Sequence, residues 1–210
     1  MTEPTQSQRT ELSSLGEFGL IKHLTHAFVN EQPSTLKGIG DDAAVIDYGD
    51  KVTLVSTDLL VEGVHFDLAY MPLRHLGYKC ATVNFSDIVA MNGTPRQLFV
   101  GISVSNRFPV EALEEIYEGI KLACNRYHVD LAGGDTTSSV HGLFLSLTVT
   151  GEASKEEVVY RHTAKENDLI CVSGDLGSAY MGLLLLEREK KVFESDPGMQ
   201  PDLAGFDYIL

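Results

Sequence analysis

The sequence is short of basic residues: Lys and Arg number 16 against 30 Asp and Glu, which gives a formal net charge of −14. Nucleic-acid binding depends on Lys and Arg that neutralise phosphates, so this balance argues against a nucleic-acid partner. No apolar run approaches the roughly 18 residues that a membrane-spanning helix needs. The polar residues 1–14 also lack the basic-then-apolar layout of a secretory signal. We therefore expect a cytoplasmic protein with no membrane partner.

Cysteine is scarce, and a common phosphate-binding motif is absent. The three cysteines, Cys80, Cys124 and Cys171, lie far apart among apolar neighbours and form no C-x-x-C pair. This predicts reduced core residues rather than a zinc or redox site. No G-x-x-x-x-G-K-S/T loop occurs. If a nucleotide binds, metal ions must therefore supply much of the positive charge that a P-loop takes from its lysine and backbone amides.

Hydrophobic content of 43% and charged content of 22% are ordinary for a globular chain, and three segments can be distinguished. Residues 1–12 are expected to be a disordered tail, and residues 13–153 a first domain. Residues 154–210 read as the start of a second, α/β domain, with a strand at 168–174 and a helix at 179–189. Another helix begins near the end of the sequence, so we expect the chain to be a fragment cut inside that domain.

Periodicity, caps and turn residues predict the elements of the first domain. A helix begins at Ser13 or Ser14 and runs to about Asn30. After it come strands at 43–48 and 52–57 joined as a hairpin, a helix at 72–91, a strand at 97–105, a helix at 110–127, and strands at 129–132 and 142–152. This order predicts an α+β fold with a mixed or antiparallel sheet and helices on one face.

Two adjacent carboxylates open the first hairpin, in the stretch GIGDDAAVIDYG at 38–49. Gly38-x-Gly40-x-x-Ala43 formally matches a dinucleotide-binding loop, but no strand precedes it and a strand follows it, so we reject that interpretation. Further on, Ser56, Thr57 and Asp58 are consecutive hard oxygen donors at an expected strand end, an arrangement that suits Mg²⁺. An ordinary turn is the alternative for both stretches.

Two further acids stand where solvation is a poor explanation. Asp87 shares a helical stripe with Leu76, Cys80 and Val83, and a carboxylate on a core-facing stripe needs partners. Asp135 follows Gly-Gly in AGGDTTSS, where the backbone can approach a ligand closely. A capping or solvent-edge Asp87 and a tight turn at Asp135 are the alternatives. Carboxylates that converge on one pocket need divalent cations between them, so we expect Asp42, Asp58, Asp87 and Asp135 to share a metal site, with Asp41 serving the turn.

Taken together, GIGDDAAVI, STDLLVEGVHF, NFSDIVAMNGTPRQLFVGISV and AGGDTT resemble the thiamine-monophosphate kinase family, of the aminoimidazole-ribonucleotide-synthetase-like ATP-binding superfamily. The resemblance runs from about Gly16 to the end of the sequence, in order. It implies transfer of the ATP γ-phosphoryl group to thiamine monophosphate, several Mg²⁺ ions, and a homodimer joined through the first domain. In-line transfer to an anionic phosphate needs no protein nucleophile or strong base, so no catalytic side chain is expected.

The resemblance also implies a role for individual residues. Metal ligands would be Asp42, Ser56, Thr57, Asp58, Asp87 and Asp135. ATP would contact Tyr117, Gly134, Asp135 and Arg161, and the substrate would contact His65. The family's later Asp-x-Ser-Asp-Gly-Leu motif and its thiamine-holding residues do not occur in the sequence. This leaves as alternatives another superfamily member, such as a selenophosphate synthetase or a hydrogenase-maturation protein, a non-catalytic metal- or nucleotide-binding module, and an acidic interaction domain.

Overall fold

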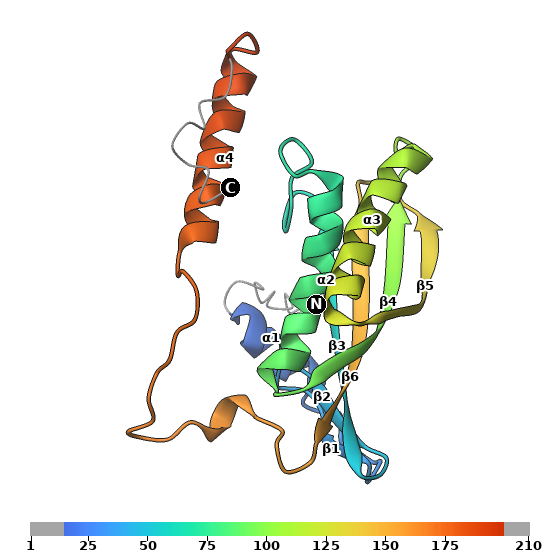
Figure 1. The fold of residues 1–210 in the computed structure, drawn as a ribbon, viewed down its shortest axis with the longest axis vertical. Helices are drawn as coiled ribbons and strands as arrows, with labels where there is room; N and C mark the ends of the chain where they lie inside the picture. The colour runs from blue at the N-terminus through green and yellow to red at the C-terminus, as the bar shows by residue number, and fades with distance from the viewer. Residues whose placement is uncertain (1–14, 200–210) are drawn as a thin grey trace, which may run out of the picture.

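The computed structural model describes residues 15–199 and shows an α+β fold built on one six-stranded sheet (Figure 1). Its strands are β1 (Thr35–Lys37), β2 (Ala44–Asp47), β3 (Lys51–Val61), β4 (Thr94–Val104), β5 (Asp130–Ser138) and β6 (Phe144–Ser154). Its helices are α1 (Gly16–Thr25), α2 (Leu73–Ala90), α3 (Val110–Tyr127), the 3-10 turn η2 (Arg161–Thr163) and α4 (Ser178–Ser195). The expected tail at 1–12 and the expected caps Ser13 and Ser14 lie outside the described residues.

The strands follow the order β1-β2-β3-β6-β4-β5 across the sheet. Neighbouring strands are antiparallel except β4 and β5, which are parallel and connected by α3. The sheet is therefore mixed, as predicted, and the β2–β3 hairpin is confirmed. β5 forms one edge of the sheet, and all nine of its residues are exposed.

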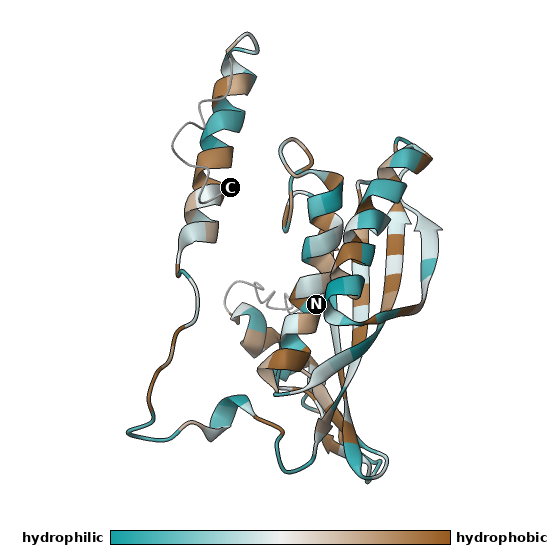
Figure 2. Ribbon diagram, viewed as in Figure 1, coloured by the Kyte–Doolittle hydropathy of each residue, from teal (hydrophilic) through white to brown (hydrophobic). Residues whose placement is uncertain are grey.

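The hydrophobic core lies between one face of the sheet and the pair α2 and α3 (Figure 2). Side chains alternate along each strand, so Leu54, Leu98 and Leu147 point into this core and are fully buried. α2 packs on β3, β4 and β6, and α3 packs on α2. On the opposite face, Leu59 and Phe99 remain 56% and 38% exposed. This open face carries both polar and apolar side chains. Among the described residues, the helix that packs on the sheet is α2, on the other face.

α2 and α3 approach each other closely because each places a glycine at the crossing. A Cβ added to Gly77 would lie 1.9 Å from the Ile116 carbonyl oxygen, and one added to Gly119 would lie 1.9 Å from the Arg74 carbonyl oxygen. Such distances exclude any side chain without movement of a helix backbone. The two glycines thus fix the helix layer that carries Asp87 and Tyr117.

Within the first domain the element types are confirmed, but several bounds differ from those predicted. The helix expected to reach Asn30 ends at Thr25, and the three-residue strand β1 was not predicted. β3 continues to Val61, beyond its predicted end at Thr57, and β5 continues through the Gly-Gly-Asp-Thr-Thr stretch, beyond its predicted end at Ala132. β6 pairs with β3, and β4 pairs with β5, along the added residues, so both strands continue even over Asp58, Gly133 and Gly134, whose strand propensity is low.

After β6 the chain crosses over to α4 without forming the strand predicted at 168–174. In the described part of the chain no neighbouring strand pairs with this stretch, and Leu169 and Ile170 are 89% and 96% exposed. Figure 2 shows hydrophobic colouring on part of the extended segment before α4. Cys171 is also exposed, so the prediction of three core cysteines is wrong for this one and confirmed for Cys80 and Cys124. No described helix is long and apolar enough to cross a membrane.

Candidate functional site: an acidic pocket beside Arg161

Several of the acids singled out in the sequence border one cavity of about 570 Å³. The turn before β2 contributes Asp41 and Asp42, the middle of β3 contributes Ser56 and Asp58, and α2 contributes Asp87. Arg161 closes the cavity from η2, and α1 borders it with Glu17, Phe18 and Ile21. Residues more than 100 positions apart in the chain are therefore brought to one place by the sheet and by the crossover after β6.

Ser56 and Asp58 reach this cavity because they share the helix-facing side of β3. The Ser56 hydroxyl, which is 8% exposed, donates a hydrogen bond of 2.6 Å to Oδ2 of Asp87. Ser56 and Asp58 were expected at the end of a strand. They lie instead inside the 11-residue strand β3. β3 and α2 thus hold their acids in fixed elements of the fold, which favours a site formed before any ligand arrives.

Burial raises the pKa values of two of these acids, and repulsion by neighbouring carboxylates adds to the rise for one of them. For Asp58, loss of solvation raises the carboxyl pKa, and nearby His65 partly offsets the rise. For Asp87, loss of solvation is again the largest cause; the Ser56 hydrogen bond lowers the pKa, while the charges of Asp58 and Asp42 raise it. The carboxylates are therefore under-compensated in the protein alone, a condition that a bound cation would relieve.

The basic group in this cavity is Arg161, whose guanidinium donates a hydrogen bond to the Asp42 carboxylate. The Asp42 carboxylate is also the largest cause of the raised pKa of Arg161, with Asp41 and Asp87 contributing. The guanidinium carbon lies 5.6 Å from the centre of the Phe18 ring, a cation–π distance. A planar donor group at the mouth of an acidic pocket is suited to hold phosphate oxygens.

Thr57 borders the same cavity, but its side chain points away from those of Ser56 and Asp58, because neighbouring residues of a strand point to opposite faces. Its hydroxyl lies on the open face of the sheet, where it is 3.0 Å from the Leu147 carbonyl oxygen and 3.0 Å from the Thr148 hydroxyl. The three consecutive donors predicted as one metal-binding trio are thus divided between the two faces. Only the pair Ser56 and Asp58 presents its side chains to the acidic pocket.

The residues expected to contact ATP lie in two places. Arg161 is at the acidic pocket, whereas Tyr117, Gly134 and Asp135 border a separate cavity of about 450 Å³ between α3 and β5. A Cβ on Gly134 would lie 1.9 Å from the Val100 carbonyl oxygen, so glycine is required there. β3 and β5 are three strand spacings apart, roughly 14 Å. Within one chain, Asp135 therefore does not share a pocket with Asp42, Asp58 and Asp87, contrary to the expected convergence.

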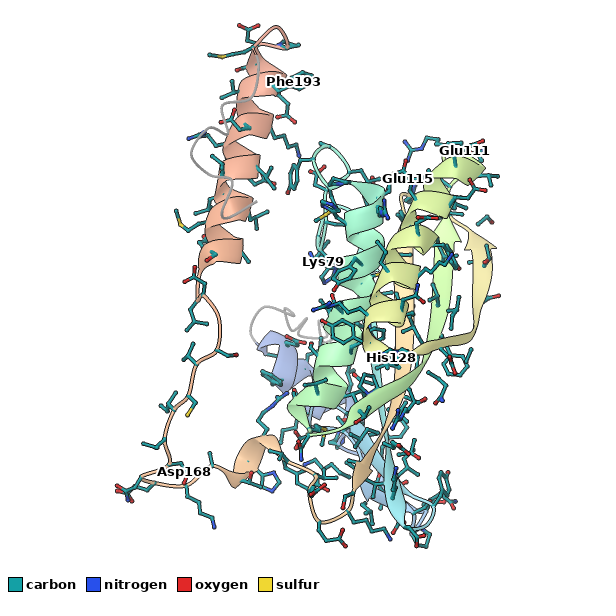
Figure 3. All side chains as sticks on the ribbon, in the orientation of Figure 1. Lys79, Glu111, Glu115, His128, Asp168 and Phe193 are labelled. Atoms are coloured by element: carbon teal, nitrogen blue, oxygen red, sulfur yellow. The ribbon has the colours of Figure 1, made fainter. Side chains whose placement is uncertain are left out.

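His65 lies in the loop after β3 and borders a third cavity, of about 610 Å³, between this loop and α4. The backbone N–H of Val61 donates to Nδ1 of His65 at 3.0 Å. The neutral imidazole therefore carries its proton on Nε2, which leaves that N–H to donate to a ligand. Lys79 of α2, labelled in Figure 3, donates to the His65 carbonyl oxygen at 2.8 Å and borders the same cavity.

Two polar contacts join α4 to this loop, and the sequence analysis predicted neither. The Tyr70 hydroxyl donates to Glu187 at 2.6 Å, and the Lys190 ammonium lies 2.5 Å from Asp67. Burial and the Glu187 carboxylate raise the pKa of Tyr70 to about 12, so its hydroxyl stays a donor at neutral pH. Asp67 and Tyr70 are three residues apart in the sequence, and so are Glu187 and Lys190. This spacing could have suggested that each pair lies on one surface, but not that the two surfaces face each other.

The donors of the acidic pocket fit a hard divalent cation, with one qualification in the geometry. Carboxylate and hydroxyl oxygens are the ligands that Mg²⁺ takes, and it keeps several positions for water or phosphate. Among residues 15–199, however, no group of three His, Cys, Asp or Glu side chains is close enough to hold a metal unaided. This arrangement suits a cation whose remaining ligands come from a bound phosphate.

Known proteins resemble this chain in sequence. The family model "AIR synthase related protein, N-terminal domain" matches residues 40–153. This range contains the carboxylates of the acidic pocket on β3, on α2 and in the turn before β2, but not Arg161. The chain is 39% identical over 176 residues to the thiamine-monophosphate kinase of Bacillus subtilis, a match that covers 83% of this chain and 54% of that protein. The chain thus spans about half the length of this curated relative.

Solved structures show the same fold. The structure of AaThiL complexed with AMPPCP and TMP has a TM-score of 0.77 and 33% sequence identity, and the match covers 97% of this chain and 64% of that one. Hydrogenase-maturation protein HypE of E. coli has a TM-score of 0.58 at 22% identity, with coverage of 81% of this chain and 54% of that one. The second likeness concerns the fold alone.

Proposed function

Because the chain belongs to the family of AIR synthase related proteins, whose N-terminal domain it carries in residues 40–153, we propose that it supplies the metal- and nucleotide-binding domain of an ATP- and Mg²⁺-dependent kinase. The reaction would convert thiamine monophosphate to thiamine diphosphate in the cytoplasm. One observation carries this proposal: Asp42, Asp58 and Asp87 border one pocket with Arg161 at its mouth. The identity of 39% to a thiamine-monophosphate kinase supports the choice of substrate.

Asp42, Ser56, Asp58 and Asp87 would hold Mg²⁺ ions between the carboxylates and the phosphates of ATP. Bound there, the ions would neutralise charge on the transferred phosphoryl group and on the leaving oxygen. Arg161 would add donor N–H groups to the phosphates once its bond to Asp42 opens. The fixed β3 and α2 positions of these ligands would supply the alignment on which phosphoryl transfer depends.

The cavity at His65 is the natural place for the acceptor phosphate. His65 is close enough to Asp58 to lower its pKa electrostatically, which supports placing the acceptor phosphate on the side of the acidic pocket that faces His65. The free Nε2–H of His65 could donate to an anionic phosphate. Because that phosphate is already a nucleophile, no protein base is needed.

Asp135, Tyr117 and Gly134, which border a separate cavity, would join the site through a second copy of the chain. Thr57 and Asp135 both lie toward the open face or edge of the sheet, which leaves Leu59, Phe99 and all of β5 exposed. A homodimer that covers this surface would remove an unpaired sheet edge. It would also bring β5 of one copy toward the acidic pocket of the other, which a single chain cannot do.

A first experiment is calorimetry of the purified chain with AMPPCP, with and without Mg²⁺, followed by chromatography for thiamine diphosphate after incubation with ATP and thiamine monophosphate. Mg²⁺-dependent binding of AMPPCP with product formation is expected for the kinase. Binding without product would favour the alternative of a metal- and nucleotide-binding module. Product with a different acceptor and none with thiamine monophosphate would favour another enzyme of the same fold.

A further inference from the structure

Asp41, which the sequence assigned only to the turn, has the more deeply buried carboxylate of the adjacent pair. Its side chain is 1% exposed, compared with 29% for Asp42. A buried carboxylate is unfavourable unless the structure uses its charge or its acceptor oxygens. The contacts of Asp41 show which of its oxygens are used.

Oδ1 of Asp41 accepts two backbone hydrogen bonds: from the N–H of Asp42 at 3.3 Å and from the N–H of Arg161 at 3.2 Å. Oδ2 accepts none. It faces two basic groups at longer range, the Lys37 ammonium at 3.7 Å and Nδ1 of His162 at 4.0 Å. The Asp41 carboxylate therefore contacts three segments: the end of β1, the turn before β2, and the η2 turn, whose Arg161 lies 120 positions later in the chain.

Apart from Asp41, η2 is held by Tyr160 at its start, which packs partly buried against the hydrophobic core, and by the ion pair between Arg161 and Asp42. It is a turn of three residues without buried side chains, within a crossover that forms no strand. Before it in the chain, the backbone is anchored by the hydrogen bond from the N–H of Val159 to the Met91 carbonyl oxygen at 3.2 Å. Arg161 itself is held twice, its backbone by Asp41 and its guanidinium by Asp42.

We propose that Asp41 is a positioning residue: it holds the backbone at Arg161, so that the guanidinium stands over the Asp42 carboxylate at the mouth of the acidic pocket. The two adjacent acids then have different tasks. Asp42 presents its carboxylate to the ligand side, and Asp41 fixes the residue that will meet the phosphates. The inference rests on the proposed function only in taking Arg161 as a phosphate contact; the backbone clamp stands independently of it.

The clamp predicts that an acceptor oxygen matters at position 41 and that the charge matters less. Asp41→Asn keeps an Oδ1 acceptor, whereas Asp41→Ala removes it. Asp50→Ala is the matched control, because it removes an exposed acid from the neighbouring β2–β3 turn. Hydrogen exchange of the Arg161 amide, measured by NMR on the metal-free chain, reports the clamp directly.

In the parent chain the Arg161 amide should exchange about tenfold more slowly than the amides of the other exposed crossover residues, the equivalent of one net hydrogen bond. Asp41→Ala should abolish this protection, while Asp41→Asn and Asp50→Ala should keep it. An Arg161 amide that exchanges as fast as its neighbours in the parent would overturn the clamp, whether or not Asp41→Ala folds. Protection of the β3 and β6 amides in the same spectra reports the fold of each variant.

A second measurement tests the consequence for the ligand. Calorimetric binding of AMPPCP with Mg²⁺ should weaken about tenfold in Asp41→Ala and by less than about threefold in Asp41→Asn. Asp41→Ala should have no further effect in a chain that already carries Arg161→Ala. Equal losses in both backgrounds would show that Asp41 acts independently of Arg161 and would contradict the proposal. If the parent itself does not bind AMPPCP, the proposed function fails, and the exchange experiment alone still decides the clamp.

Discussion

The Ser56 hydroxyl donates a hydrogen bond of 2.6 Å to the Asp87 carboxylate, and this bond joins β3 to α2 at the acidic pocket. Both partners come from elements that the hydrophobic core fixes, since Leu54 on β3 and Ile88 on α2 are fully buried. The acids of the pocket are thus held near one another by packing elsewhere, even though their charges repel. This tension between stability and ligand binding leads to the first prediction.

Asp87→Asn should stabilise the metal-free chain and abolish its stabilisation by Mg²⁺ with AMPPCP. The pKa of Asp87 is raised in the folded state, so its ionised form disfavours folding. This penalty is complete above the raised pKa and vanishes as the pH falls below the ordinary value of 3.8. At neutral pH the variant should therefore show the higher melting temperature without ligand. A lower melting temperature would contradict the electrostatic description of the pocket.

Arg161→Ala should tighten binding of Mg²⁺ alone and weaken binding of Mg²⁺ with AMPPCP. The guanidinium competes with a cation for Asp42, and because exposed ion pairs are weak, the gain in Mg²⁺ affinity should not exceed about fivefold. Calorimetry of both titrations gives the two affinities. Arg96→Ala is the control, because Arg96 pairs with Glu152 outside this pocket. Weaker binding of Mg²⁺ alone would rule out the competition.

Asp58→Asn and Asp135→Ala should each abolish Mg²⁺-dependent turnover, but mixing the two variants should restore part of it. In a two-fold symmetric dimer with sites shared between copies, each mixed dimer has one intact site and one doubly altered site. Random exchange would make half of the dimers mixed, so turnover should return to about a quarter of the parent level. The parent and the mixture are compared at equal total protein. No recovery after verified subunit exchange would show that both residues serve one chain's own site.

Gly119→Ala should destabilise the fold by about 1–3 kcal/mol, because its Cβ would meet the Arg74 carbonyl oxygen at 1.9 Å. Gly19→Ala in α1 is the matched control. There the added Cβ would lie 3.5 Å from the Leu15 Cβ, an ordinary contact, and alanine favours a helix by up to about 1 kcal/mol over glycine. Urea unfolding followed by circular dichroism gives both free energies. Equal effects would argue against the close helix crossing.

Tyr70→Phe should loosen α4 from the loop at 62–71 by about 1 kcal/mol, the net contribution of one hydrogen bond. Hydrogen exchange of residues 178–195 should rise while that of β3 and β6 is unchanged. Acid should have a related effect: Lys190 lowers the pKa of Asp67, so their ion pair favours docking above the ordinary value of 3.8 and is lost as the pH falls through the lowered value. If the hydrogen-exchange rates of α4 change neither in Tyr70→Phe nor in acid, these two contacts do not attach α4 to the loop.

The sequence predicted most of the fold where local patterns agree with tertiary packing. The bounds of α3 were predicted at Val110–Tyr127, because Pro109 starts the helix and the stripe through Ile116, Ile120 and Cys124 is strongly periodic. β5 was predicted as four residues and has nine, because its second half depends on hydrogen bonds to β4. The strand predicted at 168–174 failed for the opposite reason: its apolar residues have no pairing strand within residues 15–199.

The candidate site divides in the same way. Asp87 was identified from its place on a core-facing helical stripe, and the Ser56 hydrogen bond supplies the partner that such a position requires. The division of Thr57 from Asp58 followed from strand alternation, but only once β3 was known to continue past both. The roles of Asp41, Tyr70 and Lys190 had no such signal, since their partners lie more than 100 positions away.

The sequence by itself determined which residues can bind metal and phosphate, and roughly where most of the helices and strands lie. Those properties depend on side-chain chemistry and on patterns a few residues long. Only the tertiary structure decided which donors meet, because strand order sets the distances between distant segments. It placed Ser56 and Asp58 with Asp87, left Asp135 three strands away, and buried the Asp41 carboxylate beneath Arg161.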